Sequence, residues 1–202
     1  GTTTGTSYPD TGLTPGTAYA YVVHAVDAAN NVSAASNTAN ATTAPGSVLT
    51  FGATADATIR VGAPTTNYGT SSSLSVDGSP VEHVMMRLTV TGVGTRTVAG
   101  AKLRLFNVGA SQTGGEFYST ADNGWTETGV TWDNSPPAVG PPVATLGSVA
   151  TNTWYEVDLG SLIRGDGVYS IRLQPGSTDG VKWTSRQGAA GTTPQLVVTL
   201  AP

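Results

Sequence analysis

The chain has 202 residues, and only 11% of them are charged, for a net charge of −4 at pH 7. Average soluble domains carry roughly 25% charged residues, whereas this chain is rich in Thr (33) and Gly (26). The nine basic residues all lie at or after Arg60 and form no cluster in the sequence, which argues against nucleic-acid binding. Without cysteine there is no disulfide and no Cys-ligated metal. No apolar run approaches the roughly 18 residues of a membrane helix, so we expect no membrane insertion.

Residues 1–43 carry the pattern of about three β-strands. Tyr19, Tyr21 and Val23 alternate with smaller or polar residues, as a half-buried strand does, and a last strand is expected at 36–42. The run 13–19, Leu-Thr-Pro-Gly-Thr-Ala-Tyr, resembles the tyrosine corner of fibronectin type III domains, which are immunoglobulin-like sandwiches. The resemblance implies that the Tyr19 hydroxyl bonds to backbone a few residues upstream.

A complete fibronectin type III domain has seven strands, and three cannot bury both inner faces of a sandwich. We therefore interpret residues 1–43 as the C-terminal part of such a domain. The alternative is that a partner chain supplies the missing strands, or that the packing is rearranged.

Residues 44–48 are the predicted linker, because a Pro and a Gly stand there at a change of composition. The second domain, 49–202, is long enough for its own core. Its strand-like segments alternate apolar and polar residues, at 59–61, 85–90, 102–105, 169–173, 181–184 and 196–200. Many short strands of this kind predict a β-sandwich or jelly roll, so the whole chain is expected to be all-β. The one helical candidate is a turn at 159–164.

Two strings in the second domain carry a family resemblance. One is Ala-Asp-Ala-Thr-Ile-Arg-Val at 55–61, followed by Asn-Tyr-Gly at 67–69, and the other is Trp-Thr-Glu-Thr-Gly-Val-Thr-Trp-Asp-Asn-Ser-Pro at 125–136. With the strands that follow, residues 50–200 resemble the DNRLRE-type domain, grouped with the family 96 carbohydrate-binding modules. The resemblance implies a secreted, non-catalytic bacterial module, often attached to polysaccharide-degrading enzymes; some relatives bind alginate. Gln187 stands where the family pattern has an acidic residue, which weakens a salt bridge or metal role there.

The basic residues are the main candidates for ligand binding. Strand alternation places Arg60, Arg87, Lys102, Arg104, Arg172 and Lys182 opposite the apolar face, on the outer faces of the sheets. An Arg fork can clamp a uronate carboxylate, and Lys adds a point charge. The alternative is that these residues serve solubility and edge protection. The predicted carbohydrate-binding residues are Arg60, Arg87, Lys102, Arg104, Lys182, Arg186 and Tyr68. Three or more of Arg60, Arg87, Lys102 and Arg104 on one face would favour binding; scatter over both sheets would favour a spacer.

Aromatic and acidic residues give weaker signals. We expect all four Trp to pack in the core or in turns, while Tyr68 and Tyr118 near loops are weaker stacking platforms for sugars. A structural Ca²⁺ needs six to eight oxygens, and Asp56 is its best candidate ligand, with Asp122, Asn123, Asp133 and Asn134 as others. The alternative is that these Asp and Asn residues cap turns.

Catalysis has little support in the sequence. His83 and Arg87 share strand parity, as in some polysaccharide lyases, but an exposed strand histidine explains His83 as well. No two carboxylates are placed at a glycosidase spacing. We therefore predict no enzyme activity. The predicted function is extracellular binding of a polysaccharide, anionic and alginate-like, that keeps an attached enzyme near its substrate. The alternative is a structural spacer or adhesin segment of a cell-surface protein.

Overall fold

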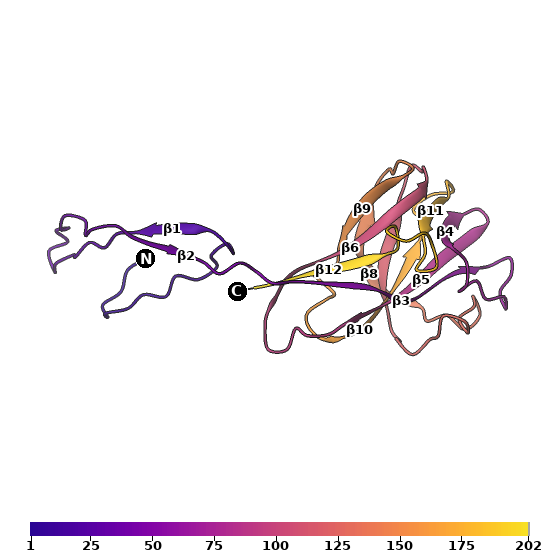
Figure 1. The fold of residues 1–202 in the computed structure, drawn as a ribbon, viewed down its shortest axis with the longest axis horizontal. Coiled ribbons are helices and arrows are strands. Elements are labelled where there is room, and N and C mark those ends of the chain that lie inside the picture. Colours follow the sequence, from indigo (N-terminus) through magenta and orange to yellow (C-terminus); the bar gives the residue numbers. More distant parts are fainter. Residues whose placement is uncertain (202) are drawn as a thin grey trace. The chain divides into compact units, whose positions relative to one another are not determined.

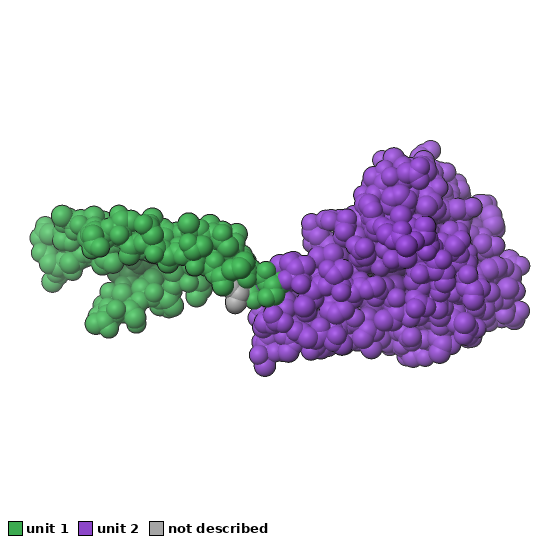
Figure 2. All heavy atoms as spheres, viewed as in Figure 1, with its two compact units in different colours: residues 1–47, 201–202 green, residues 48–200 purple. Residues whose placement is uncertain are grey.

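The computed structural model describes residues 1–201 and divides into two compact units, one built on residues 1–47 and the other spanning 48–200 (Figure 2). The division falls inside the predicted linker. Both units consist of strands, turns and loops, which confirms the all-β prediction. The helical candidate at 159–164 is a single turn, in which the Ile163 N–H donates to the Leu159 carbonyl at 2.9 Å.

The first unit is a two-stranded ladder with long loops. Strands β1 (Ala18–Tyr21) and β2 (Ala39–Thr42) pair antiparallel, and Ala18 lies opposite Thr42. The Tyr19 hydroxyl accepts a hydrogen bond of 2.8 Å from the Thr14 N–H, the upstream contact that the tyrosine-corner motif implies. Within residues 1–47 no side chain is fully buried. Membership of the fibronectin type III family stays a prediction for this unit.

The second unit is a sandwich of ten strands (Figure 1). They are β3 (Val48–Arg60), β4 (Ser73–Gly78), β5 (Val81–Val90), β6 (Val98–Gly109), β7 (Gly115–Thr120), β8 (Ala138–Leu146), β9 (Thr153–Asp158), β10 (Gly167–Gln174), β11 (Val181–Thr184) and β12 (Gln195–Leu200). In the first sheet, β12 lies between β3 and β6, and β9 pairs with the other edge of β6. Strand β11 pairs with the far end of β6, on the same edge as β12, and β4 pairs with β11 and, at its end, with β5. The second sheet runs β3–β5–β10–β7–β8.

The two sheets are joined along one side and open along the other. Strand β3 pairs with β12 through its first half and with β5 through its second half, with a register shift between Ala53 and Ala55. A register shift of this kind bends a strand, which lets β3 pass from one sheet to the other. On the opposite side, β9 pairs with β6 alone and β8 with β7 alone among residues 1–201.

The main core fills the space between the sheets. Alternate residues point inward, so that Leu196, Val198 and Leu200 of β12 are fully buried and the residues between them are half-exposed. Trp183 and Phe117 are among the largest fully buried side chains. The inward parity predicted for Trp183 is confirmed.

A second, smaller core lies on the outside of the second sheet. Residues 121–137, the covering loop, fold over this face, and Trp125 and Val130 pack on Ile59 and Met85. The Asn67 amide donates to the carbonyls of Glu127 and Val130, both at 2.7 Å. Gly69 must be glycine, because a Cβ there would lie 2.0 Å from the Glu127 carbonyl oxygen. The two family motifs therefore hold each other in place and cover the outer face of this sheet.

Candidate carbohydrate-binding face

The outer face of the first sheet is built by β6 and β9. Residues directly opposite in this antiparallel pair project to the same side. Leu103 and Val157 point into the core, so their neighbours point outward. The outward residues form three opposed pairs, Phe106 with Trp154, Arg104 with Glu156, and Lys102 with Asp158. We refer to these six residues as the β6–β9 face.

Two aromatic rings lie at one end of this face. Phe106 and Trp154 meet edge to face with ring centroids 5.4 Å apart, and both are half-buried. The Arg104 guanidinium carbon is 4.9 Å from the Trp154 centroid. The expectation that all four Trp pack in the core or in turns is therefore wrong for Trp154. It stands at the start of β9, and pairing with Phe106 puts it on the outer face.

Two cations and two carboxylates complete the face. Glu156 lies between two cations, 2.8 Å from Lys102 Nζ and 3.6 Å from Arg104 Nε. The Lys102 ammonium holds the pKa of the Glu156 carboxyl below its usual value. Arg104 also donates to Gln195 Oε1 at 3.0 Å. With Asp158, two cations face two carboxylates, so the face is polar without net positive charge.

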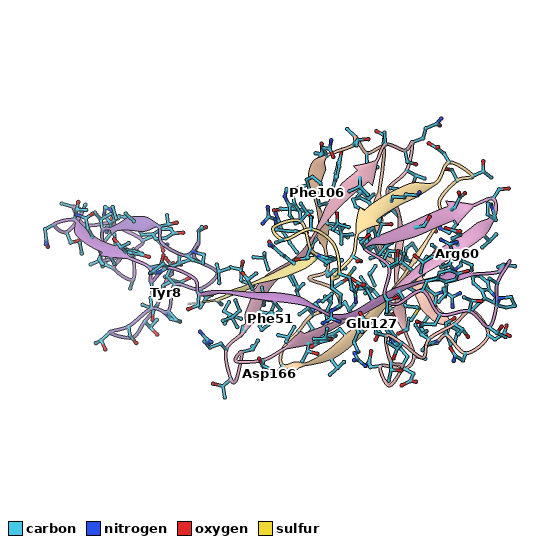
Figure 3. The ribbon with its side chains drawn as sticks, turned by 45° about the vertical axis from the view of Figure 1, so that its right-hand side comes forward. Tyr8, Phe51, Arg60, Phe106, Glu127 and Asp166 are labelled. Carbon is cyan, nitrogen blue, oxygen red and sulfur yellow. The ribbon has the colours of Figure 1, made fainter. Side chains whose placement is uncertain are left out.

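Arg60 and Arg87 lie on the second sheet, apart from Lys102 and Arg104, and Figure 3 shows Arg60 well away from Phe106. The Arg60 Nε is 3.0 Å from Glu82 Oε1, and its guanidinium covers the Tyr68 ring at 4.3 Å. Arg87 donates to the Trp125 carbonyl at 2.6 Å, which fixes the covering loop. Arg60 also departs from the predicted outer face, because it has the side of Thr58 and lies opposite in parity to Ile59, which packs under the covering loop on the outside. Of the four basic residues only Lys102 and Arg104 share a face, so the criterion of three is not met.

The remaining candidates from the sequence are dispersed. Lys182 is exposed on β11, opposite Ser75 of β4 and Gly109 of β6. Arg186 is held by an ion pair of 2.6 Å with Glu127. Tyr68 presents one ring face to Arg60 and is half-buried. Of the predicted set, Lys102 and Arg104 lie together on one outward face, that of β6.

Arg172 corrects the expectation of an exposed outer face. Its side is the predicted one, but the covering loop leaves it only 8% exposed. It donates to His83 Nδ1 at 3.0 Å, to Ser135 Oγ at 3.2 Å and to the Pro136 carbonyl at 3.1 Å. His83 is half-buried beside Trp132, and burial followed by the Arg172 charge lowers its pKa to about 4. The pair ties the covering loop to the sheet.

Asp56 lies at the meeting point of three segments. Its N–H donates to Glu127 Oε1 at 3.0 Å, and its Oδ2 accepts from the Arg186 N–H at 2.8 Å. Burial, and secondarily the Glu127 charge, raises the pKa of the Asp56 carboxyl to about 7 against a lowering by the Arg186 N–H. We name Asp56, Glu127 and Arg186 the clasp.

Calcium at Asp56 stays a prediction that the local donors do not favour. In its favour, Asp56 Oδ1 and Gln187 Oε1 are buried and accept no hydrogen bond. Against it, no three His, Cys, Asp or Glu side chains converge anywhere in residues 1–201, and a calcium ion takes six to eight oxygens. Asp122 and Asn134 instead cap turns, accepting from the N–H groups of Gly124 and Thr131.

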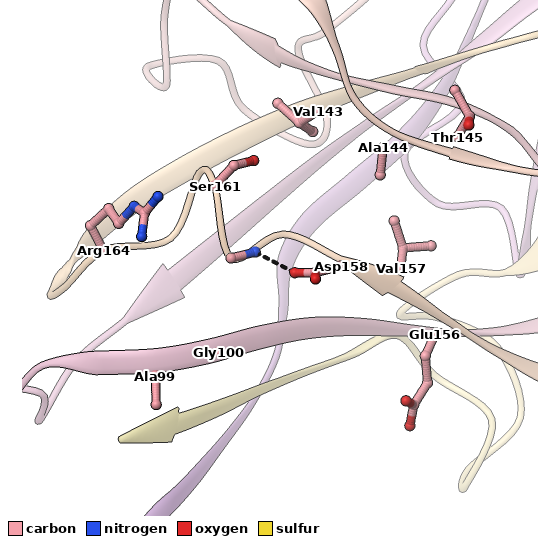
Figure 4. Close-up of a pocket in the computed structure, with 11 residues that line it drawn as sticks. Ala99, Gly100, Val143, Ala144, Thr145, Glu156, Val157, Asp158, Ser161 and Arg164 are labelled. Carbon is pink, nitrogen blue, oxygen red and sulfur yellow. Dashed lines mark hydrogen bonds between the residues drawn. The ribbon is translucent and has the colours of Figure 1, made fainter. Parts of the chain in front are cut away.

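A groove of about 580 Å³ adjoins the β6–β9 face at the open side of the sandwich (Figure 4). It is lined by Ala99, Gly100, Val143, Ala144, Thr145, Glu156, Val157, Asp158, Gly160, Ser161 and Arg164. Glu156 and Asp158 belong to both the face and the groove.

The comparisons with known proteins agree with this geometry. Residues 47–200 match carbohydrate-binding module family 96. The chain belongs to this family. Over 219 aligned positions, which cover 98% of the chain, it is also 33% identical to exoglucanase B of Cellulomonas fimi. The chain spans only 20% of that enzyme's length. A family of binding modules indicates a binding function for residues 47–200 and not a catalytic one.

Two residues of this region were not identified from the sequence. Sequence reasoning missed Arg164, because this residue follows a turn where strand alternation gives no direction. It also missed Glu156 as the partner of two predicted ligand-binding cations, although the alternation of Trp154, Glu156 and Asp158 along one strand contained that signal.

In residues 1–201 we find no helical segment with the length and hydropathy that a membrane crossing requires.

Proposed function

We propose that this module binds an extended polysaccharide along the β6–β9 face. The observation that carries the proposal is the placement of Trp154 and Phe106, both half-exposed, beside four hydrogen-bonding charged groups on two neighbouring strands. A sugar ring has apolar C–H faces and polar hydroxyl edges. Aromatic rings suit the former and fixed polar groups suit the latter. Arg104 lies over part of Trp154, so a bound sugar shares that ring with the guanidinium or displaces it.

A neutral glycan is the ligand class that we favour. The two cations of the face are matched by Glu156 and Asp158, and Lys102 and Arg104 both engage Glu156. Such a surface offers donors and acceptors together, which suits hydroxyl groups better than carboxylates. The relative named exoglucanase B points in the same direction.

An anionic, alginate-like polysaccharide is the second candidate. Lys102 and Arg104 already hold one carboxylate between them, that of Glu156. A uronate carboxylate would take its place, with Glu156 turning to solvent, since its side chain is 48% exposed. Binding of this kind weakens with added salt, because exposed ion pairs are screened.

The biological role that we propose is targeting. A secreted module that binds a polysaccharide keeps an attached enzyme near its substrate by raising the local concentration, without new chemistry. The alternative, a spacer or adhesin segment, draws on the scatter of Arg60 and Arg87 away from Lys102 and Arg104.

Calorimetric titration of the full chain with cellohexaose and with an alginate hexamer, at about 0.05 M and about 0.5 M NaCl, tests these proposals. We expect Trp154→Ala to weaken binding at least about tenfold, the equivalent of 1.4 kcal/mol, while the control Tyr118→Ala leaves it unchanged. Salt-independent binding of cellohexaose supports the neutral version, and salt-sensitive binding of the alginate hexamer that Lys102→Gln reduces supports the anionic one. If neither sugar binds, the spacer role replaces both.

A further inference from the structure

The β6–β9 face leads directly into the groove at the open side of the sandwich. Trp154, Glu156 and Asp158 occupy every second position of β9 and therefore point the same way. Successive outward residues of a strand are about 7 Å apart, so this row covers about 13 Å from the aromatic end to Asp158. Asp158 forms part of the groove wall. A polysaccharide that lies along β9 would therefore reach the groove without a change of direction.

The groove has an apolar part and a polar part (Figure 4). Val143 and Ala144 of β8, both half-buried, supply aliphatic surface, and the buried Val157 of β9 lies beneath them at the floor. Around them stand the polar groups Thr145, Asp158, Ser161 and Arg164. The groove is open here because it lies between β8 and β9, each of which has a single pairing partner, and no further strand of residues 1–201 closes the sandwich on this side.

The polar groups of the groove have hydrogen-bonding capacity to spare. Asp158 Oδ1 accepts from the Gly160 N–H at 2.7 Å, which orients the carboxylate and leaves its second oxygen available. Arg164 is exposed, and within residues 1–201 it makes neither an ion pair nor a side-chain hydrogen bond. Every other Arg side chain of the module is engaged in one or the other. The Arg164 guanidinium, the Asp158 carboxylate and the Ser161 hydroxyl thus stand around the aliphatic surface of the groove.

We propose that this groove is a second subsite, which takes a neutral, hydroxyl-bearing sugar unit of the same polysaccharide that lies on the β6–β9 face. The inference rests on the proposed function and deepens it. Glu156 is already paired with Lys102 and Arg104, which leaves Asp158 and Arg164 as the charged groups that the groove itself offers. Their charges are opposite, so hydroxyl groups find both an acceptor and a donor, whereas a uronate that approaches Arg164 also meets the Asp158 carboxylate. The aliphatic patch accommodates the C–H face of the ring.

Two variants test the subsite without touching the β6–β9 face. Ala99→Leu fills the groove from its rim, and Arg164→Gln removes its donor fork. Both residues are exposed, so the fold is expected to survive both changes. Matched controls are Ala110→Leu, just beyond the opposite end of β6, and Arg96→Gln, an exposed Arg of the loop before β6 that does not line the groove. Each variant and control is titrated with the trimers and hexamers of cello-, xylo- and manno-oligosaccharides.

We expect each groove variant to weaken hexamer binding about tenfold and to leave trimer binding unchanged, because a trimer is held on the aromatic end of the face alone. The controls are expected to bind both lengths like the parent chain. Backbone amide shifts at 99–100 and 160–164 on adding the hexamer, absent with the trimer, complete the expected result.

Different results would contradict the groove subsite and the binding role of the β6–β9 face. If Trp154→Ala abolishes hexamer binding but neither groove variant weakens it and the amides at 160–164 do not shift, the subsite is wrong and the binding face stands. If the groove responds only to the alginate hexamer, its assignment to neutral sugars is overturned. If no neutral hexamer binds the parent chain, the neutral-glycan version of the function and the subsite fall together.

Discussion

The ionisation of Asp56 costs the module stability. Its folded pKa of about 7 lies above the ordinary 3.8, so between about pH 4 and pH 7 the folded chain keeps a proton that the unfolded chain has lost. The contribution of Asp56 to the free energy of unfolding therefore falls as pH rises through that range, by at most about 4 kcal/mol, and is constant above it. His83, with its pKa lowered to about 4, acts in the opposite direction over the same range, which masks the effect in the parent chain.

Asp56→Asn removes the falling contribution and keeps an acceptor for the Arg186 N–H. We expect the free energy of unfolding of the variant, relative to that of the parent, to increase from pH 4.5 to pH 7.5, because only the parent loses the stability that the protonated Asp56 carboxyl contributes. Urea unfolding at several pH values measures this difference. His83→Asn is the control, and its difference from the parent should run the other way. Parallel curves for parent and Asp56→Asn would contradict the buried, protonated carboxyl.

Calcium gives a second test at Asp56. One Asp56 oxygen already accepts from the Arg186 N–H, and the Glu127 carboxylate is paired with the Arg186 guanidinium. We expect neither added Ca²⁺ nor EDTA to shift the melting temperature by more than about 1 °C, a small fraction of what a bound structural ion contributes by mass action. A calcium-dependent rise that Asp56→Asn abolishes would establish the metal site instead.

Strand alternation predicted the side of the sheet better than the exposure. It placed Lys102 and Arg104 outside and Trp183 inside, as the structure has them. For Arg172 it gave the right side but the wrong exposure, because the outer face of the second sheet is covered by a loop whose path depends on contacts with β3 and β5. For Arg60 it gave the wrong side, because the apolar Ile59 faces that loop and not the main core. It gave no position for Arg164, since residues in a turn follow no two-residue period.

The covering loop depends on the clasp for its attachment. Glu127 accepts from the Asp56 N–H through one oxygen and from Arg186 through the other, while its own carbonyl accepts from Asn67. Glu127→Ala leaves the Asp56 N–H without this acceptor and breaks the ion pair. Because hydrogen bonds to charged groups contribute roughly 1.5–3 kcal/mol, we expect a loss of about 2 kcal/mol.

Thermal unfolding and limited proteolysis of Glu127→Ala measure this loss, and cleavage within 121–137 should accelerate. Asp133→Ala is the matched control, because Asp133 is an exposed carboxylate of the same loop whose side chain makes no hydrogen bond or ion pair within residues 1–201. Equal effects of the two changes would show that the clasp does not hold the loop.

At the scale of strands and loops, the sequence motifs identified the family but did not predict the topology of the sheets. The strings at 55–61 and 125–136 pointed to the family that residues 47–200 match. The passage of β3 from one sheet to the other was not predictable, because it depends on pairing first with β12 and then with β5, strands far away in the sequence. The groove between β8 and β9 was not predictable either, because it lies where these two strands each have a single pairing partner within residues 1–201.

Across the whole molecule, the two units differ in how they are stabilised. Every hydrophobic side chain of the core lies between Ala53 and Leu200, whereas residues 1–47 bury none and contain one short strand pair, β1–β2. A two-stranded ladder is marginally stable in water. We therefore expect the amides of β1 and β2 to exchange with solvent orders of magnitude faster than those of β6 and β10, as measured by hydrogen exchange.

Deleting residues 1–47 is expected to leave the midpoint of the main unfolding transition within about 2 °C, since the apolar core that sets it is retained. Sugar binding on the β6–β9 face should survive the deletion, because all six of its residues lie in 48–200. If β1 and β2 instead exchange as slowly as β6, residues 1–47 have a buried face that this chain alone does not supply. In that case a second copy of the chain supplies the missing strands, as in the alternative in which a partner completes the predicted sandwich.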